Sequence, residues 1–221
     1  MKRKLKYGFR HPIEALTYLF FPQKRRLIRA EKAVREWERM ERDIKPSSPL
    51  EAYMIKPTDI HEHLATLFML TVELKLKTIV ELGTAQGEST IALLYAAKQI
   101  GGKVYSIDID PCLEAKERIK ALGLQEYWTF IQEDDLKVEW NKPIDHLFTD
   151  TSHTFNQTIR ELEKYEPYVN YGGIITLHDI VGYPEVLQAI NSYIKDRTDL
   201  RLYKYFNNWG LGIIFKRDEL T

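Results

Sequence analysis

The chain has 221 residues, 44% of them hydrophobic and 29% charged, and its formal net charge is zero. These values are typical of a soluble globular protein with one sizeable domain. The single cysteine, Cys112, excludes an internal disulfide and favours a reducing compartment. The apolar run at residues 13–21 is too short to span a bilayer and lacks a small-residue cleavage site. We therefore expect no transmembrane segment, no secretory signal and a cytoplasmic location.

The positive charge is concentrated at the N-terminal end of the chain. Residues 1–46 hold 14 Lys and Arg against six Asp and Glu, so the remainder is acidic. Residues 24–43 predict a charged helix, and a linker follows at residues 45–49. We expect a basic helical extension over residues 1–50 and a second domain over residues 51–221. The extension could bind nucleic acid or an acidic membrane surface, but its interspersed glutamates favour a homodimer contact through these helices or a cover for a substrate pocket.

The second domain alternates between helical and strand patterns. Residues 58–74 predict a helix with an apolar side. We place His61 and His63 on its solvated face, although His61 could instead face a ligand site. Short apolar runs predict strands at residues 78–82, 103–108, 127–131, 144–150 and 173–178. Helical patterns follow most of them, at residues 87–100, 110–123, 154–168 and 183–195. Two final runs flank Asn207-Asn208 and predict an antiparallel hairpin.

Local signals support several of these helix ends. Asp110 is the expected N-cap of the helix at residues 110–123, with Pro111 at the first helical position. Thr154 and Gln157 predict a capping box. The alternation predicts a doubly wound, Rossmann-like α/β domain whose seven-stranded, mostly parallel sheet ends in an antiparallel hairpin. Ligands of such sheets bind beyond the carboxyl ends of the strands.

The first strand ends in a glycine-containing turn. Gly83 would let the chain leave the strand sharply, and Gly87 would let a ligand approach the N-terminus of the next helix. The spacing is G-x-x-x-G and not the G-x-G-x-x-G of a dinucleotide fingerprint. Asp108 ends the next strand, about 20 residues further on, where an acid can bind ribose hydroxyls. The alternatives are a tight turn without a ligand and, for Asp108, a helix cap.

Ionisable side chains end the fourth and fifth strands. The expected neighbours are Asp150 and His153 on one strand end and His178 and Asp179 on the other. Either histidine could act as a general base, since imidazole titrates near neutrality. Alternatively, Asp150, Asp179 and His178 could hold a divalent cation. Each residue could also have a structural role as a cap or strand end, and we expect His146, inside its strand, to be packed.

Five segments together resemble one enzyme family. They are "ELGTAQG", "SIDIDP", "QEDD", "TDTSHTF" and "TLHDI". In this order and spacing they resemble class I S-adenosylmethionine-dependent methyltransferases over residues 58–215, and most of all a small O-methyltransferase branch of the methyltransferase 24 type. The resemblance implies cofactor contacts by Glu81, Gly83, Thr84, Gly87, Ser89, Asp108, Asp134 and Asp150. In these contacts Gly83, Gly87 and Ser89 hold the methionine end, Asp108 the ribose and Asp134 the adenine.

The resemblance also implies the reaction. The chain would transfer a methyl group, by in-line attack, to an oxygen of a small-molecule substrate. Asp150, His153, His178 and Asp179 would form the catalytic side. Two alternatives stay open: a module that binds the cofactor or a membrane surface without turnover, and a nicotinamide-dependent reductase, against which the glycine spacing argues.

Overall fold

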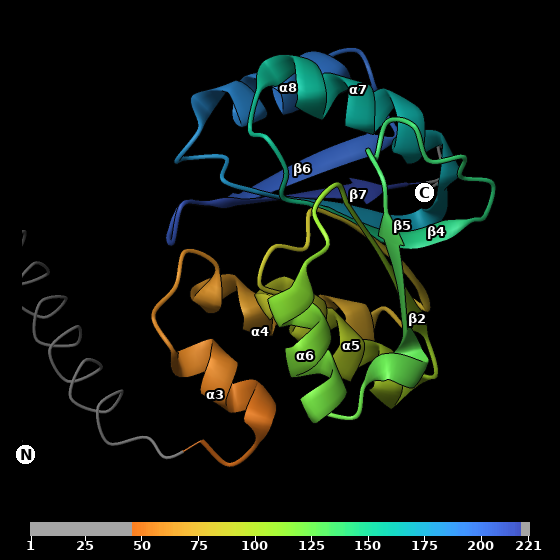
Figure 1. Ribbon diagram of the computed structural model, residues 1–221. Coiled ribbons are helices and arrows are strands. Elements are labelled where there is room, and N and C mark those ends of the chain that lie inside the picture. Colours follow the sequence, from red (N-terminus) through yellow and green to blue (C-terminus); the bar gives the residue numbers. More distant parts are fainter. Residues whose placement is uncertain (1–45, 218–221) are drawn as a thin grey trace, which may run out of the picture. The chain divides into compact units, whose positions relative to one another are not determined.

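The computed structural model describes residues 46–217, which form a sheet covered by helices on both faces (Figure 1). The seven strands lie in the order β3-β2-β1-β4-β5-β7-β6. Their bounds are β1 Thr78–Leu82, β2 Lys103–Asp108, β3 Trp128–Gln132, β4 Ile144–Thr149, β5 Val169–His178, β6 Leu200–Tyr205 and β7 Leu211–Lys216. Strands β1 to β5 pair in parallel, and β7 pairs antiparallel with β5 and β6. The predicted fold class is confirmed for this part of the chain; the N-terminal extension lies outside the described residues.

The helices fall into two layers. Their bounds are α3 Pro49–Ile55, α4 His61–Glu73, α5 Glu88–Ile100, α6 Leu113–Ala121, α7 Phe155–Tyr165 and α8 Pro184–Ile194, with short 3₁₀ turns at Gln125–Tyr127 and Glu166–Tyr168. Figure 1 shows α3 to α6 on one face of the sheet and α7 and α8 on the other. No helix among residues 46–217 is long and apolar enough to cross a bilayer.

Each layer encloses its own apolar core. Because successive side chains of a strand point to opposite faces, Ile79 packs in the core below α4 and α5, while Val80 packs in the core below α7 and α8. By the same alternation, Glu81 and Gly83 belong to the α5 side. The face to which each side chain points therefore determines which residues at the end of β1 can contact a ligand.

The strand order reverses beside β1. The chain runs outward from β1 to β2 and β3, then returns to place β4 on the other side of β1. Leu82 pairs with Thr149, and Thr149 pairs with Leu177. The residues that follow these three therefore emerge at one edge, at the position where open α/β sheets bind ligands.

Two local predictions need correction, and one helix was not predicted. Helix α6 begins at Leu113, with Cys112 as N-cap in a left-handed conformation, so both the Asp110 cap and the placement of Pro111 at the first helical position are wrong. The carboxylate of Asp108 accepts the Asp110 N–H at 2.9 Å, and the helix begins three residues later than Asp110. Helix α3, capped by Ser48, was not predicted. Thr154 does cap α7, but the Gln157 side chain bonds elsewhere, so the capping box is only half formed.

Candidate functional site

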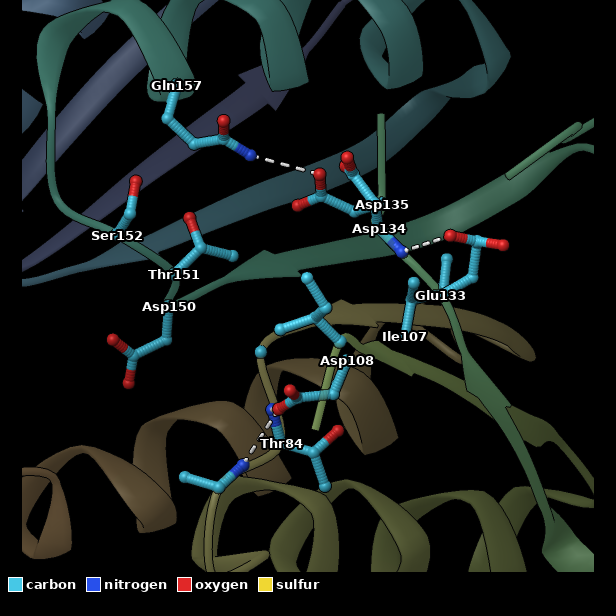
Figure 2. Close-up of a pocket in the computed structure, with 13 residues that line it drawn as sticks. Thr84, Ile107, Asp108, Glu133, Asp134, Asp135, Asp150, Thr151, Ser152 and Gln157 are labelled. Carbon is cyan, nitrogen blue, oxygen red and sulfur yellow. Dashed lines mark hydrogen bonds between the residues drawn. The ribbon is translucent and has the colours of Figure 1, made fainter. Parts of the chain in front are cut away.

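A cavity of about 410 Å³ opens at the carboxyl ends of β1, β2 and β4. Figure 2 shows the acidic residues of the β3–β4 loop on one side and Asp150, Thr151 and Ser152 on the other. The predicted residues Gly83, Thr84, Asp108, Asp134 and Asp150 line this cavity, whereas Glu81, Gly87 and Ser89 are not among its lining residues.

Gly83 brings the backbones of β1 and β4 together. Its φ is +85°, and a Cβ at this position would lie 1.9 Å from the carbonyl oxygen of Asp150. Its N–H donates to the Ile107 carbonyl at 2.9 Å. No side chain fits here, so the residue must be glycine for the turn to bring the ends of β1, β2 and β4 together.

Asp108 holds the turn that follows β1. Its Oδ2 accepts the N–H groups of Thr84 at 2.7 Å and Ala85 at 3.2 Å, and Figure 2 shows its carboxylate beside this turn. Partial burial disfavours the charge, but the N–H donors of Asp110, Thr84 and Ala85 hold the pKa of Asp108 below its usual value. The three N–H donors take three of about four lone-pair sites, and the fourth is met by the Cys112 thiol, a weak donor that a ligand hydroxyl would displace.

Glu81 lies behind the cavity in a fully buried polar cluster. Its carboxyl accepts hydrogen bonds from Ser89 at 2.7 Å, Thr90 at 2.7 Å and Ser106 at 2.5 Å. Burial raises the pKa of Glu81 to about 7, although the three hydroxyl donors oppose this shift. Gly87 also faces away, because a Cβ there would lie 2.8 Å from the Cβ of Ala115 on α6. In this arrangement Glu81, Gly87 and Ser89 brace the turn from behind.

Replacing Glu81 by glutamine should change how stability depends on pH. The folded protein keeps the Glu81 proton up to about pH 7, whereas the usual pKa of a glutamate side chain, as in the unfolded chain, is 4.5. Folding therefore becomes less favourable as the pH rises through this window, and glutamine removes the loss. Between pH 5 and pH 8 the free energy of unfolding of Glu81→Gln should rise relative to wild type by roughly 2–3 kcal/mol. Urea titrations at both pH values measure this, with exposed Glu139→Gln as control; parallel curves would contradict it.

Sequence reasoning missed a second buried cluster on the cavity wall. The Gln157 amide donates to Asp135 Oδ1 at 3.0 Å and to Glu161 Oε1 at 2.9 Å, and Thr151 donates to Glu161 at 2.6 Å. Burial raises the pKa of Glu161 to about 8. The i, i+4 spacing of Gln157 and Glu161 was a signal that they share a helix face. Their contact with Asp135, in the β3–β4 loop, carries no such local signal.

The structure brings all four predicted catalytic residues together. His153 Nε2 lies 2.9 Å from Asp150 Oδ1 and 2.9 Å from Asp179 Oδ2. His178 Nδ1 lies 3.4 Å from Asp150 Oδ2 and 3.5 Å from Asp179 Oδ2. We call these four side chains the reaction cluster. Asp150 belongs to both the cluster and the cavity lining.

The two carboxylates hold protons on both imidazoles. Hydrogen bonds to Asp150 and Asp179 raise the pKa of His153 to about 9. Burial opposes the charge on His178, but the same carboxylates raise its pKa to about 10. Burial likewise opposes charge on Asp179, yet the two histidines hold its pKa well below the usual range. Neither imidazole is a free base at pH 7 in this arrangement, and a cation between the carboxylates would compete with these protons.

Two members of the cluster have a left-handed backbone. His153 has φ +57° and Asp179 has φ +64°. A residue with a Cβ pays about 1–2 kcal/mol for this conformation. Such conformations persist where the surrounding structure enforces them, and they gather at functional sites.

The reaction cluster also has the composition of a metal site. One ligand atom each from Asp150, His153 and Asp179 lies within 4.8 Å of the others. The predicted set contained His178 in place of His153. His178 Nδ1 is buried near the same carboxylates and has no hydrogen-bond partner of good geometry. Two carboxylates with an imidazole fit a divalent cation of the first transition series better than Mg²⁺.

The remaining histidines separate into packed and site-adjacent residues. His146 is fully buried between Thr71 and Thr176, as expected of a packed residue. The prediction for His63 is wrong: it is 1% exposed, and its ring lies 5.6 Å from that of His178. Burial and the neighbouring His178 lower the pKa of His63. His61 is half-buried and bonds locally to Thr58.

The strand order, the glycine turn after β1 and the cavity at the strand ends have the arrangement of the Rossmann-like methyltransferase fold. Residues 80–180 match the family model Methyltransf_24, described as a methyltransferase domain. The match agrees with the resemblance found in the sequence and assigns a methyltransferase domain to residues 80–180.

Individual proteins are similar to the chain in sequence or in fold. The uncharacterized protein R132 of Acanthamoeba polyphaga mimivirus is 29% identical over 154 residues, which are 62% of this chain and 68% of that protein. The methyltransferase PaMTH1 of Podospora anserina, solved with S-adenosylhomocysteine, aligns with a TM-score of 0.63 at 14% identity, covering 85% of this chain and 96% of its own. The O-methyltransferase TomG of Streptomyces achromogenes, solved with S-adenosylmethionine, aligns with a TM-score of 0.60 at 15% identity, covering 80% and 92%. These structural similarities concern the fold.

Proposed function

We propose that this enzyme binds S-adenosylmethionine in the cavity at the ends of β1, β2 and β4 and transfers its methyl group to an oxygen of a small molecule. The observation that carries the proposal is that Asp150 borders this cavity and also belongs to the reaction cluster. A cofactor in the cavity would therefore lie beside the groups that can handle an acceptor's proton. The cofactor-bound relatives PaMTH1 and TomG support the choice of cofactor.

The cavity offers a different chemistry to each part of the cofactor. The turn at Gly83 and Thr84 would take the methionine end, the carboxylate of Asp108 would accept the ribose hydroxyls in place of the Cys112 thiol, and Asp134 would lie towards the adenine. The sulfonium is cationic, and the carboxylate of Asp150 at the cavity edge favours positive charge there. The residues behind the turn would not touch the cofactor. They would hold the backbone of the turn in the shape that binds it; these residues are Glu81, Gly87 and Ser89.

The substitution Asp108→Asn tests the cofactor site. Asparagine can still accept the Thr84 N–H, but it loses the charge that strengthens a hydrogen bond to a ribose hydroxyl, so affinity for S-adenosylhomocysteine should fall about 10- to 100-fold. Calorimetric titration measures the change. Asp145→Asn is the matched control, because Asp145 accepts the N–H groups of Lys77 and Thr78 at 2.9 Å, away from the cavity. Equal affinities in both variants would contradict the assignment.

The reaction cluster would handle the acceptor. For methyl transfer, the acceptor hydroxyl must be aligned with the methyl group and must lose its proton. His153 or His178 would accept that proton once a ligand has separated the imidazoles from the carboxylates. A divalent cation, held by Asp150 and Asp179 with an imidazole, would supply a Lewis acid that lowers the pKa of the acceptor hydroxyl.

Several other features stay proposals. They are the division of the chain near residue 50, a homodimer through the N-terminal helices, and a cytoplasmic location. The small-molecule acceptor is supported by O-methyltransferases such as TomG among the structures of the same fold, and its chemical identity is open to screening with hydroxylated compounds.

A further inference from the structure

A buried histidine of α4 touches the turn that supports the reaction cluster. His63 Nε2 lies 3.0 Å from the carbonyl oxygen of Asn207 and 3.1 Å from that of Asn208. Its ring meets that of His178 edge to face, at 70°. His178 Nε2 lies 3.2 Å from the same Asn208 oxygen. One carbonyl thus joins a helix outside the cluster to a histidine inside it.

This shared carbonyl determines where the protons are. A carbonyl oxygen only accepts hydrogen bonds, so His63 and His178 must each carry a proton on Nε2. The other ring nitrogen of His178, Nδ1, then faces Asp150 and Asp179 at 3.4 and 3.5 Å. The position of the Asn208 carbonyl consequently decides which nitrogen of His178 faces the two carboxylates.

The turn that carries this carbonyl cannot hold its shape alone. Asn208, Trp209 and Gly210 are successively left-handed, with φ of 44°, 67° and 90°. Two of these residues have a Cβ, so the conformation is costly and needs outside support. Part of the support comes from the loop just before α4, where Asn208 Nδ2 donates to the carbonyls of Thr58 at 3.1 Å and Asp59 at 2.8 Å.

The same turn also holds the loop after β5. The Trp209 carbonyl accepts the N–H groups of Val181 at 2.9 Å and Gly182 at 3.0 Å. Val181 lies two residues after Asp179, which has its own left-handed backbone. The turn therefore fixes the two residues that β5 contributes to the cluster: His178 through a side-chain bond and Asp179 through the backbone that follows it.

We propose that His63 is a positioning residue of the methyltransferase, which holds the Asn207–Gly210 turn so that His178 presents Nδ1 to Asp150 and Asp179. This inference rests on the proposed function, because the cluster it positions is the one assigned to the acceptor. His63 does not line the cofactor cavity. Its loss should consequently affect the reaction and leave cofactor binding intact.

The test compares His63→Leu, which removes the donor, with His63→Gln, whose amide can still donate to a carbonyl. Thr71→Val is the matched control, since Thr71 is a buried polar residue of α4 that bonds to His146 and not to the turn. In protein labelled with ¹⁵N-histidine, the Nε2–H signal of His178, assigned with His178→Asn, is followed at one fixed pH. We expect its exchange with water to be at least tenfold faster in His63→Leu and within threefold of wild type in His63→Gln and Thr71→Val.

Binding and turnover complete the test. Affinity for S-adenosylhomocysteine should stay within threefold of wild type in every position-63 variant, while kcat falls about tenfold in His63→Leu at unchanged KM for S-adenosylmethionine. Unchanged exchange in His63→Leu would overturn the inference. If His63→Leu does not fold, the spectrum of the wild-type protein serves as the test. Absence of the Nε2–H signal of His63 or of His178 would contradict the hydrogen bonds to the Asn208 carbonyl. Failure of wild type to bind S-adenosylhomocysteine would instead overturn the proposed function.

Discussion

Replacing Asp179 by alanine should lower methyl transfer at least about 1,000-fold, a loss of about 4 kcal/mol of transition-state stabilisation. Asp179 contacts both histidines of the reaction cluster and is one of the two carboxylates that could hold a cation. It does not line the cofactor cavity. Binding of S-adenosylhomocysteine should therefore remain within about threefold of wild type. The measurement is S-adenosylhomocysteine release with an acceptor found by screening, beside a calorimetric titration.

Asp199→Ala is the control for this loss. Asp199 is also a buried carboxylate, paired with Arg197 at 2.6 Å, but it lies outside the reaction cluster. Turnover should be near wild type in this variant. Retained turnover in Asp179→Ala, or loss of cofactor binding and folding, would point to a structural role. EDTA added to wild type separates the two ways in which Asp179 could act: a loss that Mn²⁺ restores indicates a cation, and unchanged activity indicates the histidines alone.

Replacing Gly83 by alanine should remove both cofactor binding and much of the stability. A Cβ at this position would lie 1.9 Å from the Asp150 carbonyl oxygen, and the left-handed φ adds strain. Relieving the overlap requires β1 and β4 to separate at the cavity. We expect the free energy of unfolding to fall by at least about 3 kcal/mol. Affinity for S-adenosylhomocysteine should fall at least about 100-fold, as urea titration and calorimetry would show.

Gly172 provides a matched control for the clash. Its φ of +82° is close to that of Gly83, but a Cβ there meets nothing within 4 Å. Gly172→Ala therefore carries the backbone strain alone, about 1–2 kcal/mol, with no effect on cofactor affinity. Equal losses in the two variants would mean that the contact with β4 is unimportant.

The sequence predicted the structure best where an apolar strand pattern ends in a glycine or in an ionisable residue. The bounds of β1 and β2 agree with the predicted runs, because each is a short apolar segment closed by a glycine turn or an acid. The meeting of Asp150 with His178 and Asp179 was predictable as well. Parallel neighbouring strands end at one edge, so residues that follow two such strands must lie close together.

Other features depended on contacts between distant segments. Glu81 and Ser89 lie behind the cavity. The alternation of side chains along β1 directs Glu81 towards the first turn of α5, where Ser89 donates a hydrogen bond to it. The Asp110 cap failed because Asp108, two residues earlier, takes the Asp110 N–H. His63 was placed in solvent, since nothing near it in the sequence reveals the turn at Asn208 that buries it.

The most direct test of the central claim is a calorimetric titration of the full chain with S-adenosylhomocysteine and, separately, with NADH. The glycine turn, Asp108 and the cavity predict binding of S-adenosylhomocysteine at micromolar concentrations and no binding of NADH. Binding of NADH without binding of S-adenosylhomocysteine would contradict the assignment of this chain as a methyltransferase that uses S-adenosylmethionine.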